Sequence, residues 1–179
     1  MASAATYTPI ATQTLASNAS SVSFTSIPQT YTDLVLVANV LGYYSVATYI
    51  GVGIQVGNGA IDTGTNYSST MLSGDGSSAA SSRATNAVSA GFWATALAAD
   101  NGTRNTVVTH FLNYSNTTTY KTWLTRFNAQ QTTNSTNIVG TTVNLWRNTA
   151  AINQISFGDF NGTNFYSGST FTLYGIASA

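Results

Sequence analysis

The stretch TVVTHFLNY, residues 106–114, and the stretch YKTWLTRF, residues 120–127, decide the fold of this chain. Both alternate polar and apolar side chains, which is the pattern of a strand with one buried face. The residues between them, with their neighbours, read NYSNTTTY (Asn113–Tyr120) and are rich in side chains that favour turns. We therefore predict a β-hairpin in which the strands Thr106–Tyr114 and Tyr120–Phe127 pair antiparallel.

Further runs of strand-forming residues lie on both sides of this hairpin. Asp33–Val40 is apolar on both faces, as expected for a central strand or for one in an oligomer interface. The pairs Asn58-Gly59 and Asp75-Gly76 supply turn positions with positive φ, as do Asn101-Gly102 and Asn161-Gly162. We interpret Ser73–Ala87, a low-complexity segment, as a surface loop. The other predicted strands are Ser21–Thr25, Tyr49–Val56, Asn66–Leu72, Ala90–Ala98, Val139–Trp146, Ile152–Phe157 and Thr170–Ile176.

The composition agrees with an all-β protein. The 179 residues include 30 Thr, 21 Ser and 17 Asn, with no Glu and one Lys, so good helix formers are scarce. Regularly spaced strands separated by turns are typical of a sandwich or barrel. We predict one antiparallel β-sandwich domain over residues 1–179, in which residues 1–20 form an N-terminal arm or an edge strand.

The charge balance excludes several classes of partner. Five basic and five acidic residues give a formal net charge of zero, which provides no long-range attraction for phosphate backbones or anionic lipid. We therefore expect no nucleic-acid or membrane partner. The chain has no cysteine, so disulfides and Cys-ligated metals are excluded. The first residues lack a secretory pattern, and we expect synthesis and folding in a cytoplasm.

Few side chains are available for catalysis. The titratable candidates are His110, Lys121, Asp33, Asp62, Asp75, Asp100 and Asp159. His110 shares a strand face with Val108 and Leu112, which favours a histidine in the core or in an interface over a catalytic base. There is no G-x-S-x-G motif to hold a Ser–His–Asp triad. We expect no enzymatic activity, catalytic residue, cofactor or metal site.

Two loops and several aromatic residues allow weaker alternatives. Asp62–Asn66 and Gly74–Gly76 resemble parts of calcium loops, but each has a single carboxylate, so we interpret them as turns. The aromatic groups Tyr43-Tyr44 and Phe92-Trp93, together with Trp123, are candidates for stacking on sugar rings. Aromatic side chains at alternating strand positions more often belong to a core or a subunit interface.

The surface chemistry points to an assembly. Ser, Thr, Asn and Gly lose little side-chain entropy when a partner covers them, and they carry no charge to desolvate. A free monomer is normally kept soluble by charge. We therefore expect the exposed faces to be covered by other protein copies in a closed homo-oligomer, with a trimer favoured by fold analogy.

Six blocks spread along the chain carry a resemblance to a known family: Tyr7–Leu15, Val22–Leu34, Asp62–Ser68, Asn113–Thr122, Leu145–Ile152 and Phe165–Ile176. Through these blocks the chain resembles a family of virion structural proteins of tailed phages, widespread among cyanophages and other marine phages. The sequence departs from the pattern of this family at Gly57–Ile61, which has the form of an insertion, and at Phe157–Asn161, which is long and glycine-rich.

This resemblance implies a jelly-roll protein on the virion surface with no catalytic motif. The function it favours is that of a capsid decoration (cement) protein, which stabilises the shell through uncharged contacts with the capsid protein or another virion protein. The alternative is a tail-fibre or receptor-binding module that recognises a host surface glycan.

Overall fold

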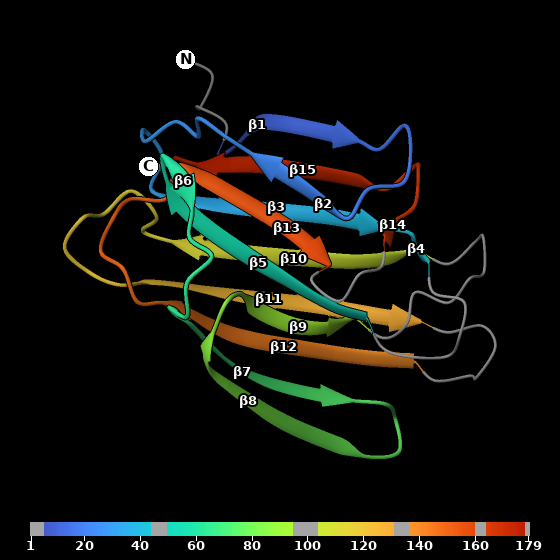
Figure 1. Ribbon diagram of the computed structural model, residues 1–179. Coiled ribbons are helices and arrows are strands. Elements are labelled where there is room, and N and C mark those ends of the chain that lie inside the picture. The colour runs from blue at the N-terminus through green and yellow to red at the C-terminus, as the bar shows by residue number, and fades with distance from the viewer. Residues whose placement is uncertain (1–5, 44–49, 95–103, 131–136, 160–163, 178–179) are drawn as a thin grey trace.

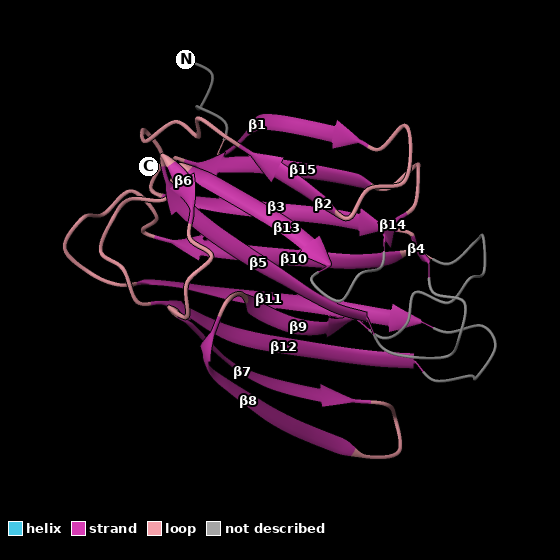
Figure 2. Ribbon diagram, viewed as in Figure 1, coloured by secondary structure: helices cyan, strands magenta, loops and turns pink. Residues whose placement is uncertain are grey.

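The computed structural model describes residues 6–43, 50–94, 104–130, 137–159 and 164–177. Within these ranges every regular element is a strand, and the strands form two antiparallel sheets packed face to face as a β-sandwich (Figure 1, Figure 2). The all-β prediction is confirmed. No helix among the described residues has the length and apolar character needed to cross a membrane.

Eight strands form a jelly roll. In chain order, the first, eighth, third and sixth lie side by side in one sheet, and the second, seventh, fourth and fifth in the other. This order is that of the two interleaved Greek keys of a jelly roll. The eight strands are β1 (Tyr7–Thr14), β2 (Ser21–Phe24), β3 (Asp33–Val40), β5 (Ile50–Asn58), β9 (Ala90–Ala94), β10 (Asn105–Leu112), β13 (Gln154–Asp159) and β15 (Thr170–Ile176).

Two inserted hairpins widen one of the sheets. The larger sheet has the order β1-β15-β3-β10-β11-β12-β7-β8, so its last four strands extend beyond the jelly roll. These four strands are β11 (Lys121–Gln130), β12 (Asn137–Trp146), β7 (Tyr67–Gly74) and β8 (Ala79–Ala87). Figure 1 shows the β7–β8 hairpin at the bottom of the view, away from the front sheet formed by β2, β13 and β5.

The hairpin predicted from residues 106–127 is confirmed. β10 and β11 pair antiparallel with Phe111 opposite Trp123, and the inward side chains of both strands are buried. The connecting loop is held by Asn116, whose Oδ1 accepts from the backbone N–H of Thr118 (2.7 Å) and Thr119 (2.9 Å). An Asx turn therefore closes the loop.

The core lies between the two sheets. Three phenylalanines from β13, β14 (Asn164–Phe165) and β15 pack with ring centroids 5.4–5.5 Å apart, and each is almost fully buried. These rings are Phe157, Phe165 and Phe171. β14 pairs with the short β4 (Gly42–Tyr43), and this pair lies outside both sheets.

The interpretation of Ser73–Ala87 as a loop is wrong. Ser73 and Gly74 end β7, residues 75–78 form a tight turn, and Ala79–Ala87 forms β8. β8 pairs with β7 along its length, yet all its residues except Ala87 are exposed. A strand with no buried face has no need of apolar alternation, so the periodicity test could not detect it.

Two of the four predicted turns are confirmed, and the other two lie outside the described residues. Gly59 has φ +76° between β5 and β6 (Ala60–Ile61), and Gly76 has φ +91° between β7 and β8. The segment Gly57–Ile61, which departs from the family resemblance, is thus a tight hairpin. Asn101-Gly102 and Asn161-Gly162 lie outside the described residues.

Candidate interaction surface

Asp62 is a structural carboxylate. Its Oδ1 accepts from the backbone N–H of Gly64 (2.8 Å), and its Oδ2 accepts from Asn66 Nδ2 (2.8 Å) and Trp146 Nε1 (2.7 Å). Partial burial raises the pKa of Asp62, but the hydrogen bonds from Trp146, Asn66 and Gly64 outweigh it, so the pKa lies below its ordinary value. All these donors belong to its own loop or to β12, so the carboxylate ties the loop to the larger sheet.

Asp75 closes the turn between β7 and β8. Its Oδ1 accepts from the backbone N–H of Ser78 (2.7 Å) and of Ser77 (2.8 Å), and from the Ser77 hydroxyl (2.8 Å). These bonds lower the pKa of Asp75 to about 2. The two calcium-loop fragments are therefore turns built around their own carboxylates. Among the described residues, no three His or Asp side chains come close enough to hold a metal ion.

The remaining candidates serve different parts of the fold. Asp33 Oδ1 accepts from the backbone N–H of Asn113 (2.6 Å) and so holds the β10–β11 loop. Lys121 is 1% exposed, and its Nζ donates to the carbonyls of Thr119 (2.7 Å) and Thr149 (3.0 Å). Burial lowers the pKa of Lys121. Asp100 lies outside the described residues, as does the environment of the Asp159 side chain.

His110 is not a core residue. It is half-buried on the outer face of the larger sheet, between Val35 on β3 and Leu124 on β11. Its predicted face-sharing with Val108 and Leu112 is confirmed, but that face points away from the second sheet. The interface interpretation of His110 stays a prediction.

The aromatic candidates for sugar stacking divide into two groups. Trp123 is 1% exposed and packs edge-on against Tyr67, with ring centroids 6.4 Å apart, so it belongs to the core as predicted. Tyr44 lies outside the described residues, and so do the side-chain environments of Tyr43, Phe92 and Trp93.

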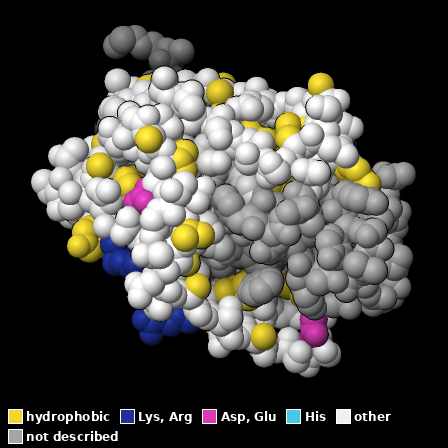
Figure 3. Space-filling view, in the orientation of Figure 1, with side chains coloured by type: hydrophobic (Ala, Val, Ile, Leu, Met, Phe, Trp, Pro, Cys, Tyr) yellow, Lys and Arg dark blue, Asp and Glu magenta, His cyan; other side chains and the backbone are white. Residues whose placement is uncertain are grey.

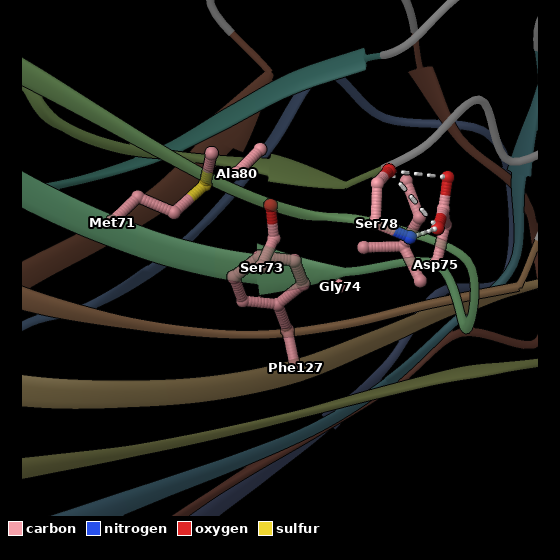
Figure 4. Close-up of a pocket in the computed structure, with 8 residues that line it drawn as sticks. Met71, Ser73, Gly74, Asp75, Ser78, Ala80 and Phe127 are labelled. Carbon is pink, nitrogen blue, oxygen red and sulfur yellow. Dashed lines mark hydrogen bonds between the residues drawn. The ribbon is translucent and has the colours of Figure 1, made fainter.

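A small cavity lies at the inner face of the extension, under the β7–β8 hairpin (Figure 4). It has a volume of about 350 Å³ and is lined mainly by Met71, Phe127, Ile138 and Ala80, with Asp75 at its rim. The Asp75 carboxylate is already bonded within its turn, and none of the other lining residues titrates near neutral pH. The cavity therefore has no pair of groups for acid–base chemistry.

The outer face of β11, β12 and β7 presents the most unusual surface. Leu72 is 60% exposed, Val139 68% and Val143 59%, and Leu124, directly opposite Val143, is also exposed. We call these four residues the outer patch. A shallow groove of about 720 Å³ begins beside the patch, where Val139 and Leu72 meet Thr141, Asn128 and Arg126. These four apolar side chains therefore lie exposed on three neighbouring strands, which marks the face as a candidate interaction surface.

Charge is nearly absent from this surface. Strand alternation places Thr106, Val108, His110 and Leu112 of β10 on the outer face, followed by the outward residues of β11, β12 and β7. Within these four described strands, Arg126 is the only outward side chain with a permanent charge. Figure 3 shows the opposite face of the molecule, which is likewise mostly uncharged, with few basic or acidic groups.

The sequence contained a signal for the outer patch. Val139–Trp146 carries apolar residues at both odd and even positions, and only the even positions point into the sandwich. The apolar residues at odd positions, Val139, Val143 and Leu145, are those left on the outside.

No known protein family, no curated protein and no solved structure matches this chain.

Proposed function

We propose that this protein is a phage virion structural protein that decorates the capsid and stabilises its shell. The observation that carries the proposal is the outer patch, an exposed apolar surface on β11, β12 and β7, whose only outward permanent charge is Arg126. The resemblance to tailed-phage virion proteins and the jelly-roll topology support it. The partner is the capsid protein or another virion protein, and the protein is made in the host cytoplasm and carried on the virion surface.

The proposed mechanism is linkage between binding and shell stability. A protein that binds the assembled shell, but not its loosened form, stabilises the shell by an amount set by its affinity and free concentration. Many identical weak contacts then add through avidity. Threonine, asparagine and valine side chains suit such contacts because burying them desolvates no charge.

The test uses one change within the outer patch. Val143→Lys places a charge at the centre of the patch on a side chain that is 59% exposed, so the fold is retained. Binding of this variant to particles that lack the protein should fall at least about tenfold, because the lysine must be desolvated. Ser21→Lys on β2 of the smaller sheet is the matched control, since Ser21 is exposed on the other side of the sandwich. Equal binding of both variants would contradict docking through the patch.

Copy number separates decoration from the main alternative. A decoration protein is present in hundreds of copies per particle, whereas a tail-fibre or receptor-binding module follows the symmetry of the tail. The alternative also requires that the purified protein adsorb to host cells through a surface glycan and compete with phage. A copy number that matches the tail would reject decoration.

A further inference from the structure

The outer edge of β8 is a free backbone surface. β8 ends the eight-stranded sheet, and no strand pairs with its outer side in the part of the chain that the structure describes. In Figure 1 it is the lowest ribbon, with nothing below it. A sheet edge presents unpaired N–H and C=O groups that bind another extended strand.

The two edges of this sheet are built differently. The opposite edge is β1, which contains Pro9 and a register shift between Pro9 and Ala11. Proline and bulges are the usual devices that prevent an edge from pairing with another chain. β8 contains no proline and one charged residue, Arg83, and it pairs with β7 without a register shift from Ala79 to Ala84. The irregularity comes only at Thr85 and Asn86, where Asn86 has φ +54°.

The side chains of β8 leave this edge accessible on both faces. Its first eight residues, Ala79–Asn86, are all exposed, and apart from Arg83 and Asn86 they are Ala, Ser or Thr. Such small groups neither cover the backbone edge nor lose much entropy when a neighbour packs on them.

We propose that β8 pairs antiparallel with β8 of a second copy, about a two-fold axis that passes through Ser82. Residues opposite each other in an antiparallel ladder point to the same face of the sheet. A two-fold axis perpendicular to the sheet must therefore lie midway between one residue and the same residue of the partner. A register centred on Arg83 places two arginines opposite each other, and one centred on Ser81 pairs fewer residues of β8. The register centred on Ser82 sets Arg83 opposite the partner's Ser81 and Ala80 opposite the partner's Ala84.

We expect the strand that pairs with β8 to come from a second copy of this chain, because the β8 edge is complementary to itself. In this register Ala80 faces the partner's Ala84 and Ser82 faces its own symmetry mate, and no like charges are opposed. Pairing joins the two larger sheets into one and continues the outer face, including Leu72, which lies across from Ser81 in the adjacent strand β7. A two-fold contact uses up both edges and closes at two copies. The inference stands independently of the proposed function, whereas the trimer expected by fold analogy requires a different contact.

The first experiment measures the mass of the full chain in solution. We expect the measured mass to reach twice the 18.7 kDa of one chain as the protein concentration is raised to about 100 µM. Because the chain has no cysteine, Ser82→Cys introduces a single thiol that should form a disulfide with its symmetry mate on mild oxidation, since opposite Cα atoms in a ladder lie about 4.5–5.5 Å apart. Thr12→Cys on the β1 edge is the control and should stay unlinked. A monomer, a trimer, or equal cross-linking of both variants would overturn the proposal.

The second experiment tests the register through charge. Ser81→Lys sets a lysine opposite the partner's Arg83 at two symmetric places, and Ser81→Asp sets a carboxylate there. We expect Ser81→Lys to weaken dimerisation about two- to thirty-fold and Ser81→Asp to strengthen it. Equal dissociation constants for the two variants would reject the register. Because Ser81 is exposed, both variants should unfold at the same denaturant concentration when measured as monomers, which separates a loss of pairing from a loss of folding.

Discussion

At the scale of single residues, the polar side chains of this protein mainly hold loops and turns in place through hydrogen bonds. Asp62 is the clearest case, because one carboxylate receives the indole N–H of Trp146, a side chain that is 1% exposed, and also binds Asn66 and Gly64. Removing a carboxylate leaves its buried donors without an acceptor. The free-energy cost of an unpaired buried donor is larger than the net stabilisation that its hydrogen bond provides.

Asp62→Ala should therefore destabilise the protein by about 1–3 kcal/mol at pH 7, because the buried Trp146 donor is left unpaired. The hydrogen bonds lower the pKa of folded Asp62, so its contribution is present above the unfolded pKa of about 3.9 and is lost as pH falls through the folded pKa. Urea unfolding should show the gap between the two proteins closing in acid. Asp75→Ala is the comparison at pH 7: its donors lie in an exposed turn where water replaces the lost acceptor, so it should cost less than Asp62→Ala, although its own contribution also falls in acid because the pKa of Asp75 is lowered. A gap that does not change with pH would contradict this role for the ionised carboxylate.

Lys121 makes a prediction of the same sign in the alkaline range. It is a buried cation held by two carbonyls, and burial lowers its pKa in the folded protein. The unfolded chain binds the proton more tightly, so stability rises with pH between the folded pKa and the unfolded pKa of about 10.4. Relative to Lys121→Met, the native protein should gain unfolding free energy over that window. A constant difference across the window would show that the ammonium is equally solvated in both states.

At the scale of elements, the extension β11–β12–β7–β8 depends on close cross-strand fits. Gly140 on β12 lies opposite Phe127 on β11, and a Cβ added at Gly140 would come within 2.3 Å of the Phe127 ring. An aromatic ring that covers a cross-strand glycine is a known device for pinning register. The ring and the glycine together fix how β11 and β12 align.

Gly140→Ala should destabilise the protein by about 1–3 kcal/mol through overpacking, measured by urea unfolding. Gly74→Ala is the matched control on β7, where an added Cβ would meet only the Ser78 carbonyl at 3.6 Å, and it should change stability by about 0.5 kcal/mol or less. Adding Phe127→Leu to Gly140→Ala should recover part of the loss. If the single alanine is neutral, the ring does not hold the register.

At the scale of the whole molecule, the near-absence of charge governs association. Ten charged residues in 179, five of each sign, give a formal net charge of zero. The outward side chains of β10, β11, β12 and β7 include one permanent charge, Arg126, and the adjacent strand β8 adds Arg83. Binding through this face should depend on apolar area and shape rather than on ionic strength.

The affinity for particles should therefore change less than about threefold between 50 and 500 mM salt, since only long-range charge interactions are screened over that range. Sedimentation of particles with bound protein measures it directly. Arg126→Gln is the control, because it removes the one permanent charge among the outward side chains of β10, β11, β12 and β7 and should flatten any residual dependence of binding on salt. A steep loss of binding with salt would point to a charged partner surface and reject the uncharged mode of contact.

The fold was largely predictable, because its main strands alternate between core and solvent. The β10–β11 hairpin and the all-β sandwich follow from that alternation and from the turn residues between strands, whereas the jelly-roll strand order does not. Two features were not predicted from this alternation. β8 has no buried face, and His110 lies on a half-apolar strand face that points outward instead of into the core. Period-two patterning identifies a face but not the side of the sandwich on which that face lies.

The amino-acid order by itself determined the class of fold, the β10–β11 hairpin and the scarcity of charge, since these depend on neighbours along the chain and on composition. Tertiary structure alone decided that two hairpins extend one sheet, that the outer patch points away from the second sheet, and that β8 forms an edge of the larger sheet in the described part of the chain. The physical reason is that strand pairing is a long-range choice. Which strand lies beside which depends on the packing of the whole sandwich, and no local pattern records it.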